Sequence, residues 1–159
     1  MATPRITPAT LGAWLIKTDP RANPDLVAAV RDAVPLVVTR RCVSDNYRGR
    51  MMAPGDRVLL WVSGDGRLVT RGIWGLGHVS AALRPRDGDG RPEVGLDLPL
   101  SPGGVPAEAV RAAGAGDLEV LRMPAGSNPS WVSRDQLAAL APLLPPWPAR
   151  SPDTTAPGA

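Results

Sequence analysis

The stretch CVSDNYRGRMMAPGDRVLLWVSG, residues 42–64, joins an irregular polar segment to a strongly apolar one. The turn signal PGD at 54–56 separates the two segments, and the apolar residues 57–62 predict a buried strand. Side chains alternate between the two faces of a strand, so Trp61 and Ser63 point the same way. The stretch therefore predicts a strand with a stacking surface and a hydroxyl on one face, preceded by a polar loop.

Further strands and helices are predicted on both sides of this stretch. Apolar and β-branched runs predict strands at residues 11–16, 36–43, 71–79, 94–100 and 117–122. Start and stop signals predict helices at residues 24–34, 106–113 and 134–144. The last helix has the strongest signal, because Ser133 and Gln136 form a capping box at its start.

Glycines interrupt the predicted strand 71–79 at Gly72, Gly75 and Gly77. Glycine weakens a strand unless a bend or a close backbone approach requires it, and small barrels need such bends. The sequence therefore predicts one α+β domain with a barrel-like sheet over residues 11–148. The polar, Pro-rich segments 1–10 and 149–159 lack apolar periodicity, and we expect them to be disordered tails.

The composition excludes several classes of protein. The single cysteine, Cys42, forms no internal disulfide, and one histidine, His78, leaves too few ligands for a Cys/His zinc site. No apolar run approaches the ~20 residues of a membrane span, and the N-terminal residues carry no export signal. We expect a cytoplasmic protein without a metal or cofactor, and the sequence leaves its oligomeric state open.

Catalytic chemistry has little support in the sequence. His78 lies in the middle of a predicted strand, where a structural role is typical. No phosphate-binding loop or dinucleotide fingerprint is present. Acidic residues between positions 87 and 97 alternate with arginines in a Pro/Gly-rich loop, which indicates a charge-balanced, solvated loop rather than a metal site. We therefore predict that the protein is not an enzyme.

The positive charge is concentrated in one part of the chain. Residues 1–80 carry a net charge of +5 and residues 81–159 carry −2, which together give the overall +3. Within the positive part, Arg40, Arg48 and Arg50 lie close together in sequence, and clustered arginines bind phosphates. The cluster predicts a phosphate-binding patch, with a partly self-neutralised surface loop as the alternative.

Four segments together resemble a known family. They are GAWLIKTDP (12–20), the stretch 42–64, GIWGLGHV (72–79) and RMPAGSNPSWVSRDQLAAL (122–140). They resemble the EVE domain of small bacterial proteins, which belongs to the PUA-like superfamily and is related to the YTH readers of methylated adenosine in RNA. The resemblance runs from residue 12 to residue 144. It rests on five pieces in the same order: Trp14 with Lys17, Asn46-Tyr47, Pro54-Gly55-Asp56, Trp61-Val62-Ser63 and Gly72-Ile73.

The resemblance implies a PUA-like bent β-barrel of about five to six strands with flanking short helices. It also implies a pocket for one flipped base, lined by Lys17, Thr18, Arg41, Asn46, Tyr47, Trp61 and Ser63. The family is associated with modified bases in DNA or RNA, often beside restriction systems. An asparagine amide suits a base edge, and tyrosine and tryptophan supply flat faces for stacking.

Arg41 departs from the family pattern. Many EVE sequences have a tryptophan five residues before the asparagine that corresponds to Asn46, where the related YTH readers have one wall of an aromatic cage. A guanidinium stacks on a base, but a cation does not favour a methylated, partly cationic base as an aromatic ring does. Either the ligand differs from that of the family, or Trp131 or Trp61 supplies the wall.

We therefore predict a non-catalytic nucleic-acid-binding module that reads a flipped, modified base in DNA or RNA. Three alternatives stay open at this point. The same pocket suits a free base or nucleoside, which would make the protein a small-molecule binding module. The other two are an enzyme acting on nucleic acid and an accessory protein of a restriction or defence system that acts through protein contacts.

Overall fold

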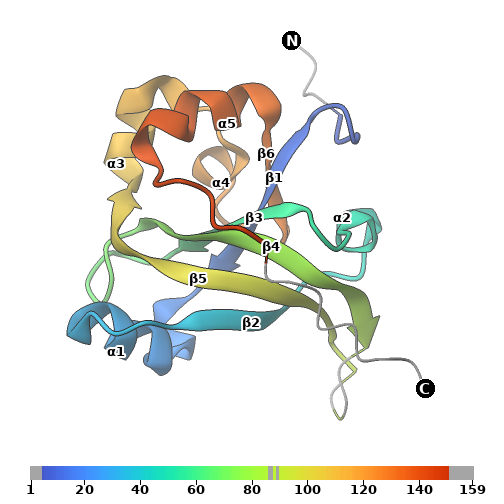
Figure 1. Ribbon diagram of the computed structural model, residues 1–159, viewed down its shortest axis with the longest axis horizontal. Coiled ribbons are helices and arrows are strands. Elements are labelled where there is room, and N and C mark those ends of the chain that lie inside the picture. The colour runs from blue at the N-terminus through green and yellow to red at the C-terminus, as the bar shows by residue number, and fades with distance from the viewer. Residues whose placement is uncertain (1–4, 86–87, 89, 151–159) are drawn as a thin grey trace.

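The computed structural model describes residues 5–85, 88 and 90–150. These residues form a mixed sheet of six strands in the order β2-β5-β4-β3-β1-β6 (Figure 1). β1 and β3 are parallel, and all other neighbouring strands are antiparallel. The strands are β1 (Leu11–Thr18), β2 (Val37–Cys42), β3 (Arg57–Val62), β4 (Gly72–Pro85), β5 (Pro92–Pro106) and β6 (Ser130–Ser133).

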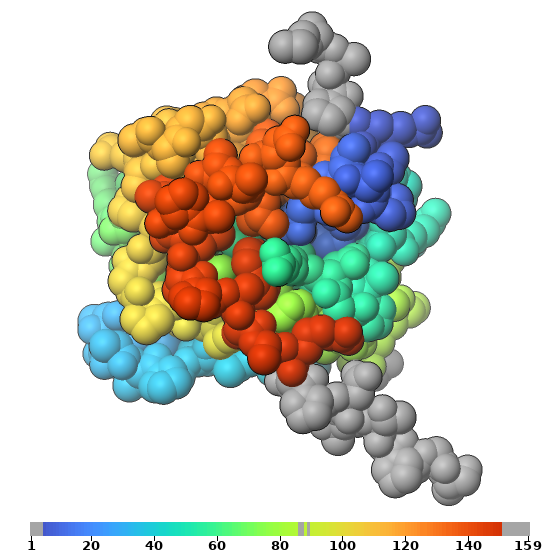
Figure 2. Space-filling model, turned by 45° about the horizontal axis from the view of Figure 1, so that its top comes forward, coloured from blue at the N-terminus to red at the C-terminus, as the bar shows by residue number. Residues whose placement is uncertain are grey.

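Five short α-helices flank the sheet in the described part of the chain. α3, α4 and α5 lie together on one side of it, α1 lies beside the start of β2, and α2 lies at the opposite end (Figure 1). In the space-filling view, the light blue residues of α1 and the blue-green residues of α2 also lie on opposite sides of the molecule (Figure 2). None of these helices is long and apolar enough to cross a membrane. Their bounds are α1 (Pro24–Asp32), α2 (Tyr47–Met51), α3 (Ala107–Val110), α4 (Glu119–Arg122) and α5 (Arg134–Leu140).

The sheet curls around one apolar core. All six strands contribute buried side chains to a single cluster, among them Trp14, Val38, Val58, Val79, Leu96 and Trp131. The sheet is bent, because Arg41 of β2 lies 3.5 Å from Thr18 of β1 although three other strands stand between β2 and β1 in the strand order. The α+β fold class is therefore confirmed, with a strongly bent sheet whose strand order has two ends rather than a closed ring.

A second core lies between the other face of the sheet and helices α3 to α5. It contains Leu15, Leu59 and Trp61 from the sheet and Val110 and Leu140 from the helices. In β3, residues alternate strictly between the two cores, as the period of a strand requires. This arrangement confirms the predicted alternation and places Trp61 on the helix-covered face.

The glycines of β4 allow the close approach that the bend requires. A Cβ atom on Gly77 would lie 2.0 Å from the carbonyl oxygen of Asp97 in β5, so no other residue fits there. The pairing of β4 with β5 also shifts register at three places along its length. The prediction that glycines mark a bent strand is confirmed.

Most predicted elements are present, and one is wrong. Residues 117–122, predicted as a strand, contain the helical turn α4 (Glu119–Arg122). Leu118 and Val120 are buried, and in so short a segment two apolar residues two apart fit a strand or one helical turn equally well. The polar segment before the strand 57–62 was predicted as a loop, but residues 47–51 form helix α2. No element was predicted at β6, which is only four residues long.

Residues 5–10, at the N-terminal end of the described chain, contact the rest of the domain. Ile6 is buried in the first core, and the backbone N–H of Arg134 donates to the carbonyl of Thr10 at 2.9 Å. Residues 5–10 therefore contact the domain, although the segment 1–10 was expected to be a tail. Residues 1–4 and 151–159 lie outside the described residues.

Candidate nucleic-acid interface

Asn46 and Tyr47 lie at the start of α2. The side-chain oxygen of Asn46 accepts hydrogen bonds from the backbone N–H groups of Arg48 and Gly49, at 3.1 and 3.2 Å. Asn46 is thus the N-cap of α2, and its oxygen is used to hold the helical turn. The next residue, Tyr47, is 59% exposed. A capped turn therefore presents the ring of Tyr47 to the surrounding solvent.

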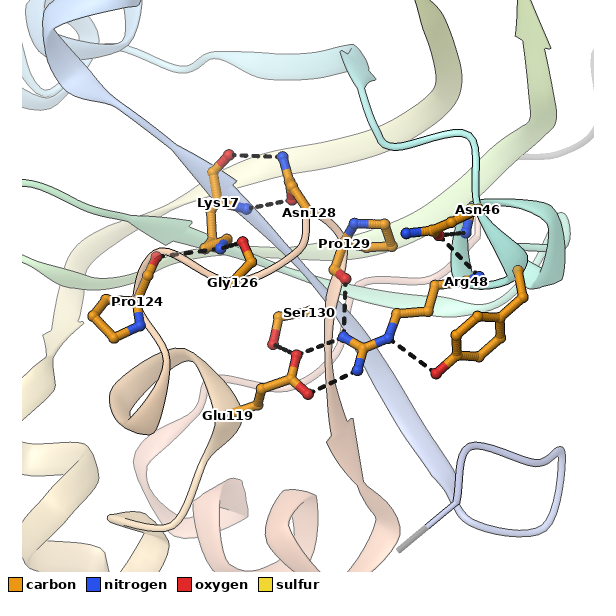
Figure 3. A network of polar contacts seen from close by, with 11 residues as sticks. Lys17, Asn46, Arg48, Glu119, Pro124, Gly126, Asn128, Pro129 and Ser130 are labelled. Atoms are coloured by element: carbon orange, nitrogen blue, oxygen red, sulfur yellow. Dashed lines mark hydrogen bonds and ion pairs between the residues drawn. The ribbon is translucent and has the colours of Figure 1, made fainter. Parts of the chain in front are cut away.

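Arg48 fastens this turn to the rest of the domain through Glu119 (Figure 3). One guanidinium nitrogen of Arg48, Nη2, lies 2.9 Å from Oε2 of Glu119, and the Ser130 hydroxyl donates to Oε1 at 2.9 Å. The two charged side chains are only 16% and 13% exposed. Arg48 also donates from Nε to the Tyr47 hydroxyl at 3.3 Å. The ion pair therefore links α2, α4 and β6.

The ion pair shifts the proton affinity of both partners. Burial opposes ionisation of Glu119, but the hydrogen bonds from Arg48 and Ser130 outweigh it and hold the pKa of the carboxyl below its ordinary value. The hydrogen bond to Glu119 raises the pKa of Arg48 further above its usual range. Both groups are therefore charged at neutral pH, and Arg48 is already neutralised by a carboxylate within the protein.

Lys17 holds the loop that leads into β6 (Figure 3). Its ammonium donates to the carbonyls of Pro124, at 3.2 Å, and Gly126, while its backbone N–H and C=O bond the side chain of Asn128 at 3.1 and 3.3 Å. Burial is the main cause that lowers the pKa of Lys17, with Glu119 acting against it. Lys17 therefore positions the loop 123–129 beside the ends of β1 and α4.

Thr18 and Ser63 meet where β1 and β3 end. The N–H and the hydroxyl of Ser63 both donate to the carbonyl of Thr18, at 3.0 and 3.1 Å. Arg41 reaches the same place from β2, where its Nε lies 3.5 Å from the Thr18 hydroxyl oxygen. The bend of the sheet thus brings three distant segments of the chain together where β1 and β3 end.

Arg41 has no carboxylate partner in the part of the chain that the structure describes. Its guanidinium donates to the carbonyl of Arg40 at 3.0 Å and approaches Thr18, and both partners are uncharged at these atoms. Burial lowers the pKa of Arg41, with the neighbouring Cys42 thiol acting against the shift. Arg41 is therefore a half-buried cation whose charge is not compensated within the described residues.

Trp61 lies apart from the other predicted pocket residues. Its side chain is 1% exposed and packs in the core beneath the helices, with the Arg71 guanidinium 5.9 Å from the ring centroid. Trp131, considered as an alternative pocket wall, is also buried, in the first core. Neither ring shares the solvent-exposed surface on which Tyr47 lies.

The three arginines predicted to bind phosphate differ in their surroundings. Arg40 is exposed and forms no ion pair with any described residue. Arg50 pairs with Asp45 at 3.0 Å, but both side chains are more than half exposed, so solvent screens the pair. Arg48 is held by Glu119, as described above. Arg40 and Arg50 are accessible to a polyanion, whereas Arg48 has a structural contact.

Sequence reasoning missed three residues of this region: Glu119, Asn128 and Ser130. Glu119 fell in the segment wrongly predicted as a strand, and no local pattern marks a carboxylate that pairs with an arginine 71 positions away. Asn128 and Ser130 lie in the segment 122–140 that resembles the EVE domain, and this resemblance was the one available signal. His78 is buried in β4, and no cluster of three metal-binding side chains occurs within the described ranges.

Comparison with known proteins gives a fold and no family. No protein-family model and no curated protein matches the sequence. Among solved structures, protein Atu2648 from Agrobacterium tumefaciens is similar with a TM-score of 0.60 and 20% identity, over 89% of this chain and 99% of that one. Protein Rpa0253 from Rhodopseudomonas palustris has a TM-score of 0.57 and 18% identity, over 82% and 91%.

A third similar structure is that of human THYN1 in complex with DNA that contains 5-methylcytosine. Its TM-score is 0.53 and its identity 14%, over 82% of this chain and 96% of that one. The TM-scores of 0.53 to 0.60 establish a common fold. At identities of 14–20%, function has to be argued from the site itself. The resemblance to the EVE domain is thus supported at the level of the fold.

Proposed function

We propose that this protein is a non-catalytic module that binds nucleic acid and takes up one unstacked, modified base where β1, β2 and α2 meet. The observation that carries the proposal is Tyr47. Its ring is 59% exposed on a capped helical turn that a largely buried ion pair holds in place. The Arg48 guanidinium lies over the ring, 6.0 Å from its centroid, which helps to fix a ring that is accessible for stacking on a base. The similar fold of a protein solved with methylated DNA supports the same function.

Each residue at the interface has a role in this proposal. Tyr47 stacks on a base, and Arg41 donates hydrogen bonds to the ligand. The exposed Arg40 and Arg50 contact phosphates, which gives affinity without sequence preference. Lys17, Thr18 and Ser63 fix the ends of the strands around the ligand, and Asn46 holds the turn that carries Tyr47. Trp61 contributes to stability alone.

The energies involved predict modest affinity with strong salt dependence. Unstacking a base costs a few kcal/mol, and less in a single strand, while stacking on an aromatic side chain returns about 1–3 kcal/mol. Phosphate contacts add affinity by counterion release, so each contact steepens the dependence on salt concentration. Single-stranded ligands should therefore bind more tightly than duplexes of the same sequence.

Fluorescence anisotropy with labelled oligonucleotides tests the proposal. Single- and double-stranded DNA and RNA, each with cytosine or 5-methylcytosine and adenine or N6-methyladenine, are titrated at about 50 and 200 mM salt. We expect binding that weakens with salt, and a slope that falls by about one for each of Arg40→Ala and Arg50→Ala. Arg31→Ala is the matched control, because Arg31 is an exposed arginine paired with a neighbouring aspartate on α1, away from the interface.

Two results would contradict the proposal. One is the absence of binding to every oligonucleotide at the lower salt concentration. The other is salt-independent binding of free nucleosides without binding of oligonucleotides, which would identify a small-molecule module instead.

A further inference from the structure

A polar cavity of about 250 Å³ lies between the start of α1 and strand β2. Its walls are residues 22–26 on one side and 36–41 on the other. The volume suits a group the size of a single base rather than a larger ligand. Two of its lining residues, Arg41 and Asp25, carry opposite charges without forming an ion pair with each other.

Arg41 brings free hydrogen-bond donors to this cavity. A guanidinium has five N–H donors, and the two contacts of Arg41, to the Arg40 carbonyl and the Thr18 hydroxyl, leave three of them. Half-buried arginines normally pair with a carboxylate, since an uncompensated buried charge is costly. The three remaining N–H donors of Arg41 therefore suit a ligand with hydrogen-bond acceptors.

Asp25 brings acceptors to the same cavity. It lies in the first turn of α1 and is exposed, and its carboxylate has no hydrogen-bond or ion-pair partner within residues 5–85, 88 and 90–150. An ionised carboxylate only accepts hydrogen bonds. The exposed Arg40 lines the cavity as well, so its lining carries two positive charges and one negative charge. The donor fork of Arg41 and the acceptor pair of Asp25 lie on different walls, and together they suit a ligand that carries both hydrogen-bond acceptors and donors.

Among the bases, guanine matches this pattern. Its O6 and N7 atoms form the acceptor pair that arginine binds bidentately, and its N1–H and N2 amino groups are donors suited to a carboxylate. Adenine offers N7 beside an amino donor, so it fits the arginine fork less well. We propose that the cavity between α1 and β2 is a subsite of the protein for a second base of the bound strand, a guanine, which Arg41 and Asp25 recognise; this rests on the proposed nucleic-acid binding.

Anisotropy titrations of the full chain test the subsite with single-stranded oligothymidylates. Each carries one central guanine, 7-deazaguanine, adenine or cytosine. We expect the guanine ligand to bind about ten-fold more tightly than the other three, because 7-deazaguanine lacks the N7 acceptor and the other bases lack the O6/N7 pair. Arg41→Lys keeps the positive charge and removes the fork, so the ratio between guanine and 7-deazaguanine should fall to about one.

Asp25→Asn is an independent variant and should reduce the preference for guanine over adenine several-fold. Asp32→Asn, at the other end of α1, is its control, because it removes one exposed carboxylate far from the cavity wall. Equal binding of all four ligands by the unaltered protein, or a guanine preference that both Arg41→Lys and Asp25→Asn retain, overturns the subsite and leaves the proposed function standing. Absence of binding to every oligonucleotide overturns both.

Discussion

The two half-buried arginines at the interface, Arg48 on α2 and Arg41 on β2, are placed differently. Arg48 faces the carboxylate of Glu119, which a second hydrogen bond from Ser130 holds in position. Arg41 faces a carbonyl and a hydroxyl. One guanidinium is neutralised within the protein, and the other keeps its charge and most of its donors. The α2 side is therefore held by an ion pair within the protein, whereas the β2 side has an arginine without a carboxylate partner among the described residues, and our proposal assigns that arginine to the ligand.

The difference shows why a cluster of arginines in sequence is a weak guide to binding. Arg40, Arg41, Arg48 and Arg50 lie within eleven positions, yet each has different surroundings. A paired, buried arginine contributes to the fold and has few donors left for phosphate. Which of these arginines have free donors depends on where carboxylates lie in the folded chain, as the pairing of Arg48 with the distant Glu119 shows.

Breaking the α2 side should have the largest effect on stability. Glu119→Gln removes the charge that compensates Arg48, and we expect a loss of about 2–3 kcal/mol in the free energy of unfolding. The estimate lies below that for a fully buried pair, because the two side chains retain 13% and 16% exposure. Urea unfolding followed by circular dichroism measures it. A loss below about 0.5 kcal/mol would show that the pair does not hold α2 in place.

The same pair makes stability depend on pH. The folded pKa of Glu119 lies below its value in the unfolded chain, so its contribution is fully present above the unfolded pKa and is lost as the pH falls through the folded pKa. The stability gap between the unaltered protein and Glu119→Gln should therefore narrow as the solution is acidified below about pH 4.5. Unfolding curves of both proteins from neutral to acidic pH measure the gap, and a constant gap would contradict the role of the ionised carboxylate.

Substitution of Tyr47 tests whether its exposed ring on α2 stacks on a base. Tyr47→Ala should weaken oligonucleotide binding about ten-fold, since stacking returns about 1–3 kcal/mol per base. It should leave the unfolding midpoint nearly unchanged, because the ring is 59% exposed. Tyr47→Phe is the matched variant, which keeps the ring and loses only the hydroxyl that accepts from Arg48. If Tyr47→Phe loses as much binding as Tyr47→Ala, the contact is a hydrogen bond rather than stacking.

Asn46 contributes through the backbone of α2. Asn46→Ala removes the N-cap and should cost about 1 kcal/mol of stability. Asn46→Ser keeps a cap and should recover most of that loss. Thermal unfolding of the two variants separates them. If Asn46→Ser recovers the stability and still binds the oligonucleotide as weakly as Asn46→Ala, the amide contacts the ligand directly and is not only a cap.

Local patterns predicted the parts of this fold that local interactions determine. The capping box of Ser133 and Gln136 is present as predicted, and the strand 57–62 has the predicted bounds. Trp14 and Asp56, which belong to two of the motif pieces, contact each other. The indole N–H of Trp14 donates to the carboxylate of Asp56 at 2.9 Å and links β1 to the turn before β3.

The candidate site could be predicted only in part. The sequence singled out Lys17 and Arg48, but the contacts of Lys17 depend on the loop 123–129 and those of Arg48 on α4, segments that lie more than 70 positions away. Trp61 was expected at the pocket from the resemblance to the EVE domain, and it shares a strand face with Ser63. That face is covered by helices from the C-terminal half of the chain, and the period of a strand does not show which of its two faces is covered.

Arg41→Met and Arg48→Met compare the β2 side and the α2 side directly. Of the two substitutions, Arg41→Met should change the free energy of unfolding less. Arg41→Met loses two hydrogen bonds, worth about 1 kcal/mol each, but also removes an uncompensated buried charge, so the net change in the free energy of unfolding should lie within about 1 kcal/mol of zero. Arg48→Met should lose about 2–3 kcal/mol, because it leaves Glu119 buried without its partner. Urea midpoints with equal m-values would make the two numbers comparable. Equal losses at the two sites would show that Arg41 has a structural partner as strong as Glu119, and the distinction between a side held by an ion pair and a side open to a ligand would no longer hold.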